Sequence, residues 1–302
     1  MKKLLVIGGT GFIGYHIIKE AKKRKLKVTS ISLSKPKLKR FHKNVKYISL
    51  NITDYQSLKK KLKKNFDFVI NAGGYGGNPD FGPSGKILFD SHYLGLINLI
   101  KVLSKKKIKK FVQIGSSDEY GRSKSPQKEN YDCFPQTPYS LAKLACTNFL
   151  LNLYKINNFP VTIIRLFLVY GPKQDNNRIL PHVIENCLKN KSFPLTKGEQ
   201  YCDFCFIDDA VNAMFKTFNL KKTNGKIINV GSGNPIKIKK AINLICKMIG
   251  AGKPRFGKLK YKKNINMKLY PDITRAKKLI KWKPKINFLQ GIKLTISTFK
   301  NG

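Results

Sequence analysis

The sequence predicts an α/β protein with a doubly wound parallel sheet and a smaller C-terminal α/β part. In the first half, short runs rich in Val, Ile and Leu alternate with segments of helical pattern. After Pro172 the alternation becomes irregular. Strands that are apolar along their whole length, and that are separated by helices, are typical of βαβ units whose sheet is covered on both faces.

The order of the elements follows from this alternation. The predicted strands of the first half are residues 3–9, 26–33, 45–52, 66–74, 110–117 and 161–171. The predicted helices between them are residues 12–24, 54–64, 85–106 and 138–156. Beyond Pro172 we expect helices at 179–190, 208–219 and 237–249, strand-like segments at 202–209 and 226–233, and a polar tail. We therefore place one domain at 1–171 and a smaller part at 172–302.

Composition bounds the class of protein. With 302 residues and 41% hydrophobic content, the chain can bury a sizeable core. It has no run of about 18 apolar residues, so we expect no membrane span. The start "MKKLLVIGGTG" is too short for a signal peptide, which predicts a cytoplasmic protein. Cys202 and Cys205 form a C-x-x-C without a second pair, so we expect buried thiols and no metal site.

The net charge of +44 raises the question of a polyanionic partner. Only seven of the 60 basic residues are Arg, the side chain that reads bases through bidentate contacts. The lysine clusters at 22–27, 59–64 and 105–110 each end a predicted helix, where cations interact favourably with the helix dipole. We expect solvated lysine faces and no specific nucleic acid. Attraction to a polyanion or an anionic membrane surface is the alternative.

A glycine-rich turn lies between the first predicted strand and the first helix. In "VIGGTGFIG", Gly8, Gly11 and Gly14 have the spacing G-x-x-G-x-x-G. Glycines permit a tight turn and close approach to a diphosphate, which the helix N-terminus then binds through free N–H groups. The sequence thus predicts a Rossmann-type dinucleotide site that also includes Thr10, Phe12 and Ile13.

The end of the second strand indicates which dinucleotide binds. An acid there would bond the ribose 2′-hydroxyl of NAD, and "SISLSKPKLKR" (30–40) has none. Ser32 and Ser34 stand there, followed by Lys35, Lys37 and Arg40. Serines with cations suit a 2′-phosphate, so NADP(H) is favoured. In the alternative, the lysines belong to the general excess and the serines bond NAD.

Reactive side chains follow in two places. Tyr139 and Lys143, in "PYSLAK", are spaced i and i+4 and share one face of a helix that opens at Pro138. An ammonium group near a phenol favours the phenolate, so we expect Lys143 to lower the pKa of Tyr139. Ser116 and Ser117 follow the strand "KFVQIG" at the same edge of the sheet.

With these residues, the chain resembles the extended short-chain dehydrogenase/reductase family, in its nucleotide-sugar epimerase, dehydratase and ketoreductase branch. The resemblance covers essentially the whole chain and rests on "GGTGFIG", "SSDEYG", "YSLAK", "RLFLVYGP", "DFCFIDDA" and "NVGSG". It implies that Tyr139 exchanges a proton with a sugar oxygen, which Ser116 hydrogen-bonds. It also implies that Lys143 holds the nicotinamide ribose, and that residues 172–302 bind the substrate.

The resemblance extends to further positions. It places Asn51 and Ile52 at the adenine, and Ala72 and Gly73 along the cofactor, with ordinary turn residues as the alternative. It makes Ser117, Asp118 and Arg178 substrate contacts, with an ordinary surface residue as the alternative for Arg178. The chain departs from the family at three positions, with Leu168 for a usual Asn, Cys202 for a frequent Arg and His92 for a common Asn. Cys202 puts one substrate diphosphate contact in doubt, and we assign His92 no role.

The reaction stays open among three that the resemblance implies. A 4-ketoreductase needs the triad and exchangeable NADPH, which fits the residues at 30–40, and is preferred. A 4-epimerase needs the triad and tightly held NAD, and is the alternative. A 4,6-dehydratase needs an acid–base pair, for which Ser117 and Asp118 are poorly suited, while Glu119 is expected to be structural. A non-enzymatic dinucleotide or RNA binder is the remaining class. The expected partners are a nucleotide-diphosphate sugar and a second copy of the chain, through residues 85–106 and 138–156.

Overall fold

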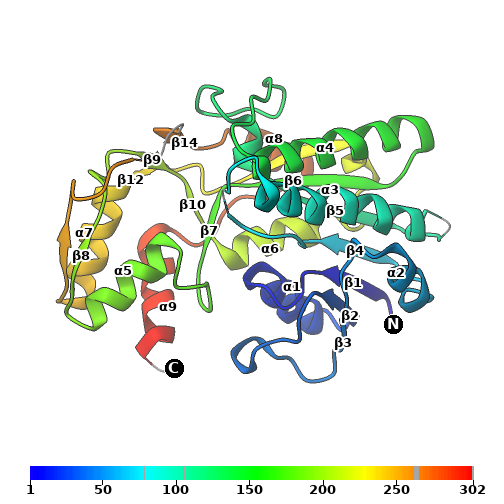
Figure 1. The fold of residues 1–302 in the computed structure, drawn as a ribbon, viewed down its shortest axis with the longest axis horizontal. Coiled ribbons are helices and arrows are strands. Elements are labelled where there is room, and N and C mark those ends of the chain that lie inside the picture. The colour runs from blue at the N-terminus through cyan, green and yellow to red at the C-terminus, as the bar shows by residue number, and fades with distance from the viewer. Residues whose placement is uncertain (78, 105, 262–264, 301–302) are drawn as a thin grey trace.

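The protein is built around one seven-stranded sheet. A computed structural model describes residues 1–77, 79–104, 106–261 and 265–300. The strand order is β11-β6-β5-β4-β1-β2-β3, and every neighbouring pair is parallel. The strands are β1 (Lys3–Ile7), β2 (Lys27–Ser32), β3 (Lys46–Ser49), β4 (Phe68–Asn71), β5 (Lys110–Ser116), β6 (Val161–Leu166) and β11 (Lys226–Val230). The predicted fold class is confirmed (Figure 1).

Helices cover both faces of the sheet (Figure 1). One layer holds α2 (Tyr55–Lys61), α3 (Pro83–Leu103) and α4 (Pro138–Asn157), and the other holds α1 (Phe12–Lys23), α6 (Ile207–Lys216) and α8 (Thr274–Ile280). Strand β1 packs against both helix layers, since the side chains of Leu4 and Val6 lie in one apolar core and those of Leu5 and Ile7 lie in the other. Strands buried on both faces lack polar alternation, which explains the continuous apolar runs of the sequence.

A smaller part adjoins this sheet on the left of Figure 1. It contains α5 (Ile179–Leu188), α7 (Ile238–Ile249) and α9 (Phe288–Lys300). Its short strands are β8 (Ser192–Pro194), β9 (Tyr201–Cys202), β12 (Ile236–Lys237), β13 (Lys253–Arg255) and β14 (Lys268–Leu269). The prediction of a polar tail was wrong, because α8 and α9 lie there. Lysine-rich faces mask the buried side chains of Trp282, Ile292 and Ile296.

One predicted strand, residues 161–171, is two strands in different sheets. β6 ends at Leu166, and β7 (Leu168–Tyr170) pairs with β10 (Phe204–Phe206). The break falls at Phe167, whose N–H donates to the Val230 carbonyl, while the N–H of Leu168 donates to Asp203. The main sheet takes β11 from beyond residue 171. The division of the chain at that residue stays a prediction.

The composition raised the questions of a membrane span, of disulfides and of a metal site. Within the described ranges, no helix is long and apolar enough to cross a membrane. The six cysteines, all in those ranges, are free, and Cys202 and Cys205 are buried. Among the residues that the structure describes, no group of three or more His, Cys, Asp or Glu side chains is arranged to bind a metal.

Candidate active site

The glycine-rich turn and the carboxyl ends of β1, β2, β3 and β4 line a cavity of about 210 Å³. Gly8 has φ +78° and an added Cβ would lie 2.6 Å from the Ala72 carbonyl oxygen, so a side chain does not fit. An added Cβ on Gly14 would lie 2.1 Å from the Gly8 oxygen, which brings α1 against the turn. The predicted cofactor residues that line the cavity are Gly8, Thr10, Gly11, Ser32, Ser34, Asn51, Ile52, Ala72 and Gly73.

The other predicted cofactor residues of the described chain lie outside this lining. Phe12 and Ile13, in the first turn of α1, pack partly buried against the core. Lys35 is exposed beyond the end of β2. Tyr139 and Lys143 belong to α4. The cavity therefore gathers the residues predicted for the adenosine and diphosphate end, and α4 carries those predicted for the nicotinamide end.

The residues predicted to read the cofactor 2′ position differ in exposure and in the hydrogen bonds that they already make. The Ser32 hydroxyl accepts a hydrogen bond from the Thr10 N–H at 3.2 Å. Ser34 and Lys35 are exposed. Arg40 is buried, and its guanidinium donates to Asp175 Oδ1 at 2.8 Å and to the Lys173 carbonyl. Arg40 is thus bonded to the loop after β7, and the preference for NADP(H) stays a prediction.

The structure brings Ser116, Tyr139 and Lys143 together at the carboxyl edge of the sheet. Ser116 ends β5, and its Oγ accepts the Asp118 N–H at 3.1 Å, which leaves the hydroxyl proton to donate. Thr137 caps α4 in a capping box with Ser140, so that Tyr139 lies in the first turn. Lys143 Nζ donates to the Ile114 carbonyl at 3.0 Å and lies 5.7 Å from the Tyr139 ring centroid.

Burial dominates the electrostatics of this site. It raises the pKa of Tyr139, with the Asp118 charge adding to the shift and a hydrogen bond with Ser116 opposing it. Burial also lowers the pKa of Lys143. The expected lowering of the Tyr139 pKa is thus not observed, because desolvation of the phenolate outweighs nearby positive charge.

Asp118 and Arg178, both predicted substrate contacts, approach the triad. Asp118 is solvent-exposed, and the charge of Arg178 favours the ionised form of its carboxyl. Arg178 caps the start of α5 and its guanidinium lies 2.7 Å from the position of an added Cβ on Gly76. Ser117 is buried. An anionic substrate group could therefore meet Arg178 beside Tyr139.

His92 is a neighbour of the triad that sequence reasoning left without a role. It is buried on α3, and its Nε2 lies 2.9 Å from the Tyr75 carbonyl oxygen. Its ring meets that of Tyr139 edge to face, with centroids 5.4 Å apart. Burial and the charge of Lys143 lower the pKa of His92 to about 3, so the ring is neutral. The sequence signal that could have pointed to His92 is its departure from the Asn that is common in the family at this position.

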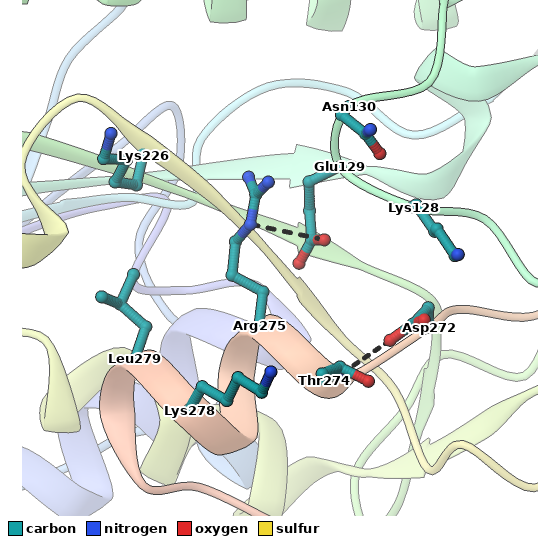
Figure 2. A pocket seen from close by; sticks show the side chains of 9 residues that line it. All are labelled: Lys128, Glu129, Asn130, Lys226, Asp272, Thr274, Arg275, Lys278 and Leu279. Atoms are coloured by element: carbon teal, nitrogen blue, oxygen red, sulfur yellow. Dashed lines mark hydrogen bonds and ion pairs between the residues drawn. The ribbon is translucent and has the colours of Figure 1, made fainter.

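A second cavity of about 630 Å³ lies between α8, β11 and residues 128–130 (Figure 2). Arg275 points toward Glu129 there, with their charged atoms 3.6 Å apart. None of the predicted site residues lines it. The larger cavity is therefore separate from the residues that carry the chemistry.

The parallel sheet, the glycine cradle and the Ser–Tyr–Lys constellation at one sheet edge define a dinucleotide-dependent oxidoreductase of the short-chain type. Comparison with known families identifies the branch. The sequence model of the NAD dependent epimerase/dehydratase family matches residues 4–231, and the chain belongs to that family. The resemblance predicted from the motifs is thereby confirmed.

Relatives match along their whole length. The chain is 27% identical to a UDP-glucuronate 4-epimerase of Thermodesulfobacterium geofontis, over 98% of this chain and 95% of the relative. It is also 27% identical to a UDP-N-acetyl-alpha-D-glucosaminuronate decarboxylase of Bacillus cytotoxicus, over 99% and 98%. A Bacillus cereus UDP-glucuronic acid 4-epimerase, solved with UDP-glucuronic acid and NAD, has the same fold with TM-score 0.89, 23% identity and 99% coverage of both chains.

Proposed function

We propose that the protein is an NAD-dependent 4-epimerase of nucleotide-diphosphate sugars, preferably UDP-sugars. The observation that carries the proposal is the meeting of Ser116, Tyr139 and Lys143 beside the glycine-lined cavity. Two further points favour epimerisation over the ketoreduction that the sequence favoured. Arg40 is bonded to Asp175 and to the Lys173 carbonyl, and one relative that matches 98% of this chain is a UDP-glucuronate 4-epimerase.

The residues present fit a nicotinamide dinucleotide, because the turn at Gly8 and Gly14 has no room for side chains and lies at the start of a helix. When bound, that cofactor would accept and return a hydride at the sugar C4. Tyr139 exchanges a proton with the C4 oxygen, and Ser116 donates a hydrogen bond to the same oxygen. Lys143 has two further N–H groups beyond the one on Ile114 with which to hold the nicotinamide ribose.

A 4-ketoreductase that uses NADPH is the second candidate. It is favoured by the absence of an acid in residues 30–40 and by the exposed Ser34 and Lys35. A 4,6-dehydratase ranks third, because the carboxylate of Glu119 is already paired with Arg165, which leaves Asp118 to serve as both acid and base.

One experiment separates these candidates. The purified protein is denatured, its bound nucleotide is identified, and the native protein is incubated with a panel of UDP-, dTDP- and GDP-sugars and their 4-keto forms. Bound NAD, with interconversion of C4 epimers detected by proton NMR and no net change in cofactor redox state, supports the epimerase. Stoichiometric NADPH oxidation by a 4-keto sugar would replace it with the reductase. Loss of a C6 hydroxyl would indicate the dehydratase.

The predicted homodimer forms part of the proposal. The outer surfaces of α3 and α4 expose Ile87, Leu94 and Leu141, which are 62%, 41% and 40% accessible. Burial of this apolar face against a second copy would stabilise a dimer. Light scattering of the wild type and of the double variant Leu94→Lys, Leu141→Lys tests it, and a wild-type mass of one chain would reject it.

A further inference from the structure

We propose that Glu119 is a positioning residue that sets the separation between Ser116 and Tyr139. The inference rests on the proposed function, in which those two residues act on one sugar oxygen. The sequence predicted a structural role for Glu119, and the proposal gives this side chain a specific task in the reaction.

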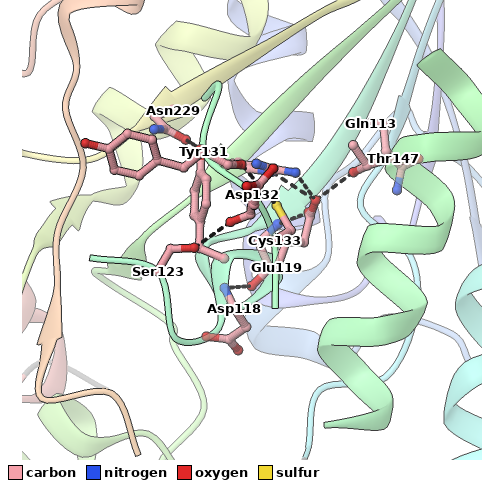
Figure 3. A network of polar contacts seen from close by, with 12 residues as sticks. Gln113, Asp118, Glu119, Ser123, Tyr131, Asp132, Cys133, Thr147 and Asn229 are labelled. Carbon is pink, nitrogen blue, oxygen red and sulfur yellow. Dashed lines mark hydrogen bonds and ion pairs between the residues drawn. The ribbon is translucent and has the colours of Figure 1, made fainter. Parts of the chain in front are cut away.

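The carboxylate of Glu119 joins three elements of the fold. Its Oε1 accepts the backbone N–H of Ser116 at 2.8 Å, which completes the capping box of the short 3-10 helix η2 (Ser117–Tyr120). Its Oε2 accepts from Arg165 of β6 at 2.9 Å and from the Thr147 hydroxyl of α4 at 2.8 Å. Figure 3 shows Glu119 turned toward Thr147, whereas Asp118 points away from it.

Thr147 is the member of this network that reaches the other half of the site. Tyr139, Lys143 and Thr147 are spaced four residues apart and therefore share one face of α4. Through one carboxylate, the helix that carries Tyr139 is bonded to the backbone of Ser116 itself. Neither bond reaches solvent, because Glu119 and Thr147 are 0% accessible.

Stability alone does not account for a buried charge at this place. A buried ion pair such as Glu119 with Arg165 costs desolvation that its attraction only partly offsets, and apolar residues of similar volume often do as well. The fold also keeps a glycine at 115, where an added Cβ would lie 2.6 Å from Glu119 Oε1. Apolar residues could not accept the hydrogen bonds that the Ser116 N–H and the Thr147 hydroxyl donate to Glu119.

The cleanest variant is Thr147→Val, which removes one hydroxyl and keeps the shape and the charges. Because small misplacements of reacting groups are costly, we expect kcat to fall about tenfold. The KM for the nucleotide sugar and the Kd for NAD stay within about twofold, since the lost contact touches neither ligand. Thr147→Ser restores the hydroxyl and recovers kcat.

The matched control is Thr295→Val. Thr295 is also a buried helical threonine, and its hydroxyl donates to the Gly291 carbonyl at 2.7 Å on α9, away from the site. We expect a similar loss of stability with unchanged kcat. A Thr147→Val enzyme with wild-type kcat, or a Thr295→Val enzyme that is equally slow, would overturn the proposal.

A second variant tests Glu119 without leaving a buried Arg unpaired. In Glu119→Gln with Arg165→Met, the charges are removed together, so the fold is preserved while the Thr147 bond is weakened. We expect kcat to fall about 100-fold with NAD affinity retained. Recovery of wild-type kcat in this double variant would show that Glu119 serves folding alone.

A measurement independent of turnover keeps the two proposals apart. Crystal structures of the NAD complex of the wild type and of Thr147→Val give the distance between Ser116 Oγ and Tyr139 Oη. A wider distance in the variant supports positioning even where no nucleotide sugar is turned over, in which case the proposed function alone fails. An unchanged distance rejects positioning even where the wild type is an active epimerase.

Discussion

The ends of two strands of the same sheet are built in opposite ways. At the end of β5, Ser116, Ser117 and Glu119 are buried, and Glu119 is bonded to Thr147 of α4 and Arg165 of β6. At the end of β2, Leu33, Ser34 and Lys35 are exposed, and beyond Ser32 the chain meets solvent. The first end holds the groups proposed to react, and the second holds the residues predicted to read the 2′ position of the cofactor.

The two strand ends differ in how strongly the loss of one side chain is expected to affect the reaction rate or the binding of the cofactor. A buried donor or proton carrier acts where water cannot replace it, so its loss costs orders of magnitude in rate. An exposed cation is hydrated and screened by salt, so its loss costs a small factor. The chemistry is therefore expected to depend on the β5 end, and the choice between NAD and NADP to be adjusted by small steps at the β2 end.

The largest effect is expected for Tyr139→Phe. Without the phenol proton, kcat falls about 1,000-fold or more, since general acid–base catalysis contributes about 10²–10⁴. The Kd for NAD, measured by fluorescence titration, stays within about twofold, because the glycine cavity is untouched. A variant that turns over normally would remove the β5 end from the chemistry, and one that loses NAD would show that the two ends are not separable.

Ser116→Ala ranks next. Loss of a donor to the developing oxyanion is expected to lower kcat about 100-fold. The variant also loses the acceptor for the Asp118 N–H, a cap worth about 1 kcal/mol. Ser116→Thr keeps both and should retain most of the rate, whereas Ser297→Ala on α9 controls for removal of a hydroxyl elsewhere. Equal rates for the Ala and Thr variants would contradict the assignment.

What the sequence could predict follows the same division. The sheet, the glycine turn and the pair Tyr139–Lys143 depend on local pattern, and each was found where expected. Arg40 is bonded to residues 133 and 135 positions away, and the partners of Glu119 lie 28 and 46 positions away. Such contacts leave no periodic signal, so the engagement of Arg40 and the network of Glu119 could not be predicted.

His92 gives a pH test of the buried region. Its pKa is about 3 in the folded protein, whereas histidine in an unfolded chain titrates near 6.5. The unfolded state therefore binds the proton more tightly, and stability that is complete above about pH 6.5 is lost as the pH falls toward 3. Between about pH 7 and 4.5 this amounts to about 2–3 kcal/mol.

His92→Asn should remove that loss. We compare the change in unfolding free energy between the two pH values, from urea titration, because the variant also leaves a cavity that lowers stability at both. His182→Asn, at an exposed histidine of α5, should keep the wild-type change. The same acid loss in wild type and His92→Asn would mean that the ring is not enclosed against Tyr139.

The smallest effect is expected at the β2 end, for Lys35→Ala. An exposed cation near a 2′-phosphate is worth little, so the Kd for NADPH should rise about three- to fivefold at low salt and the difference should vanish in about 1 M salt. The Kd for NAD, which has no 2′-phosphate, should not change. Lys59→Ala, an exposed lysine of α2, is the control for the general excess of positive charge. A salt-independent loss of 100-fold would mean that Lys35 is enclosed with the cofactor, and that the β2 end is as tightly organised as the β5 end.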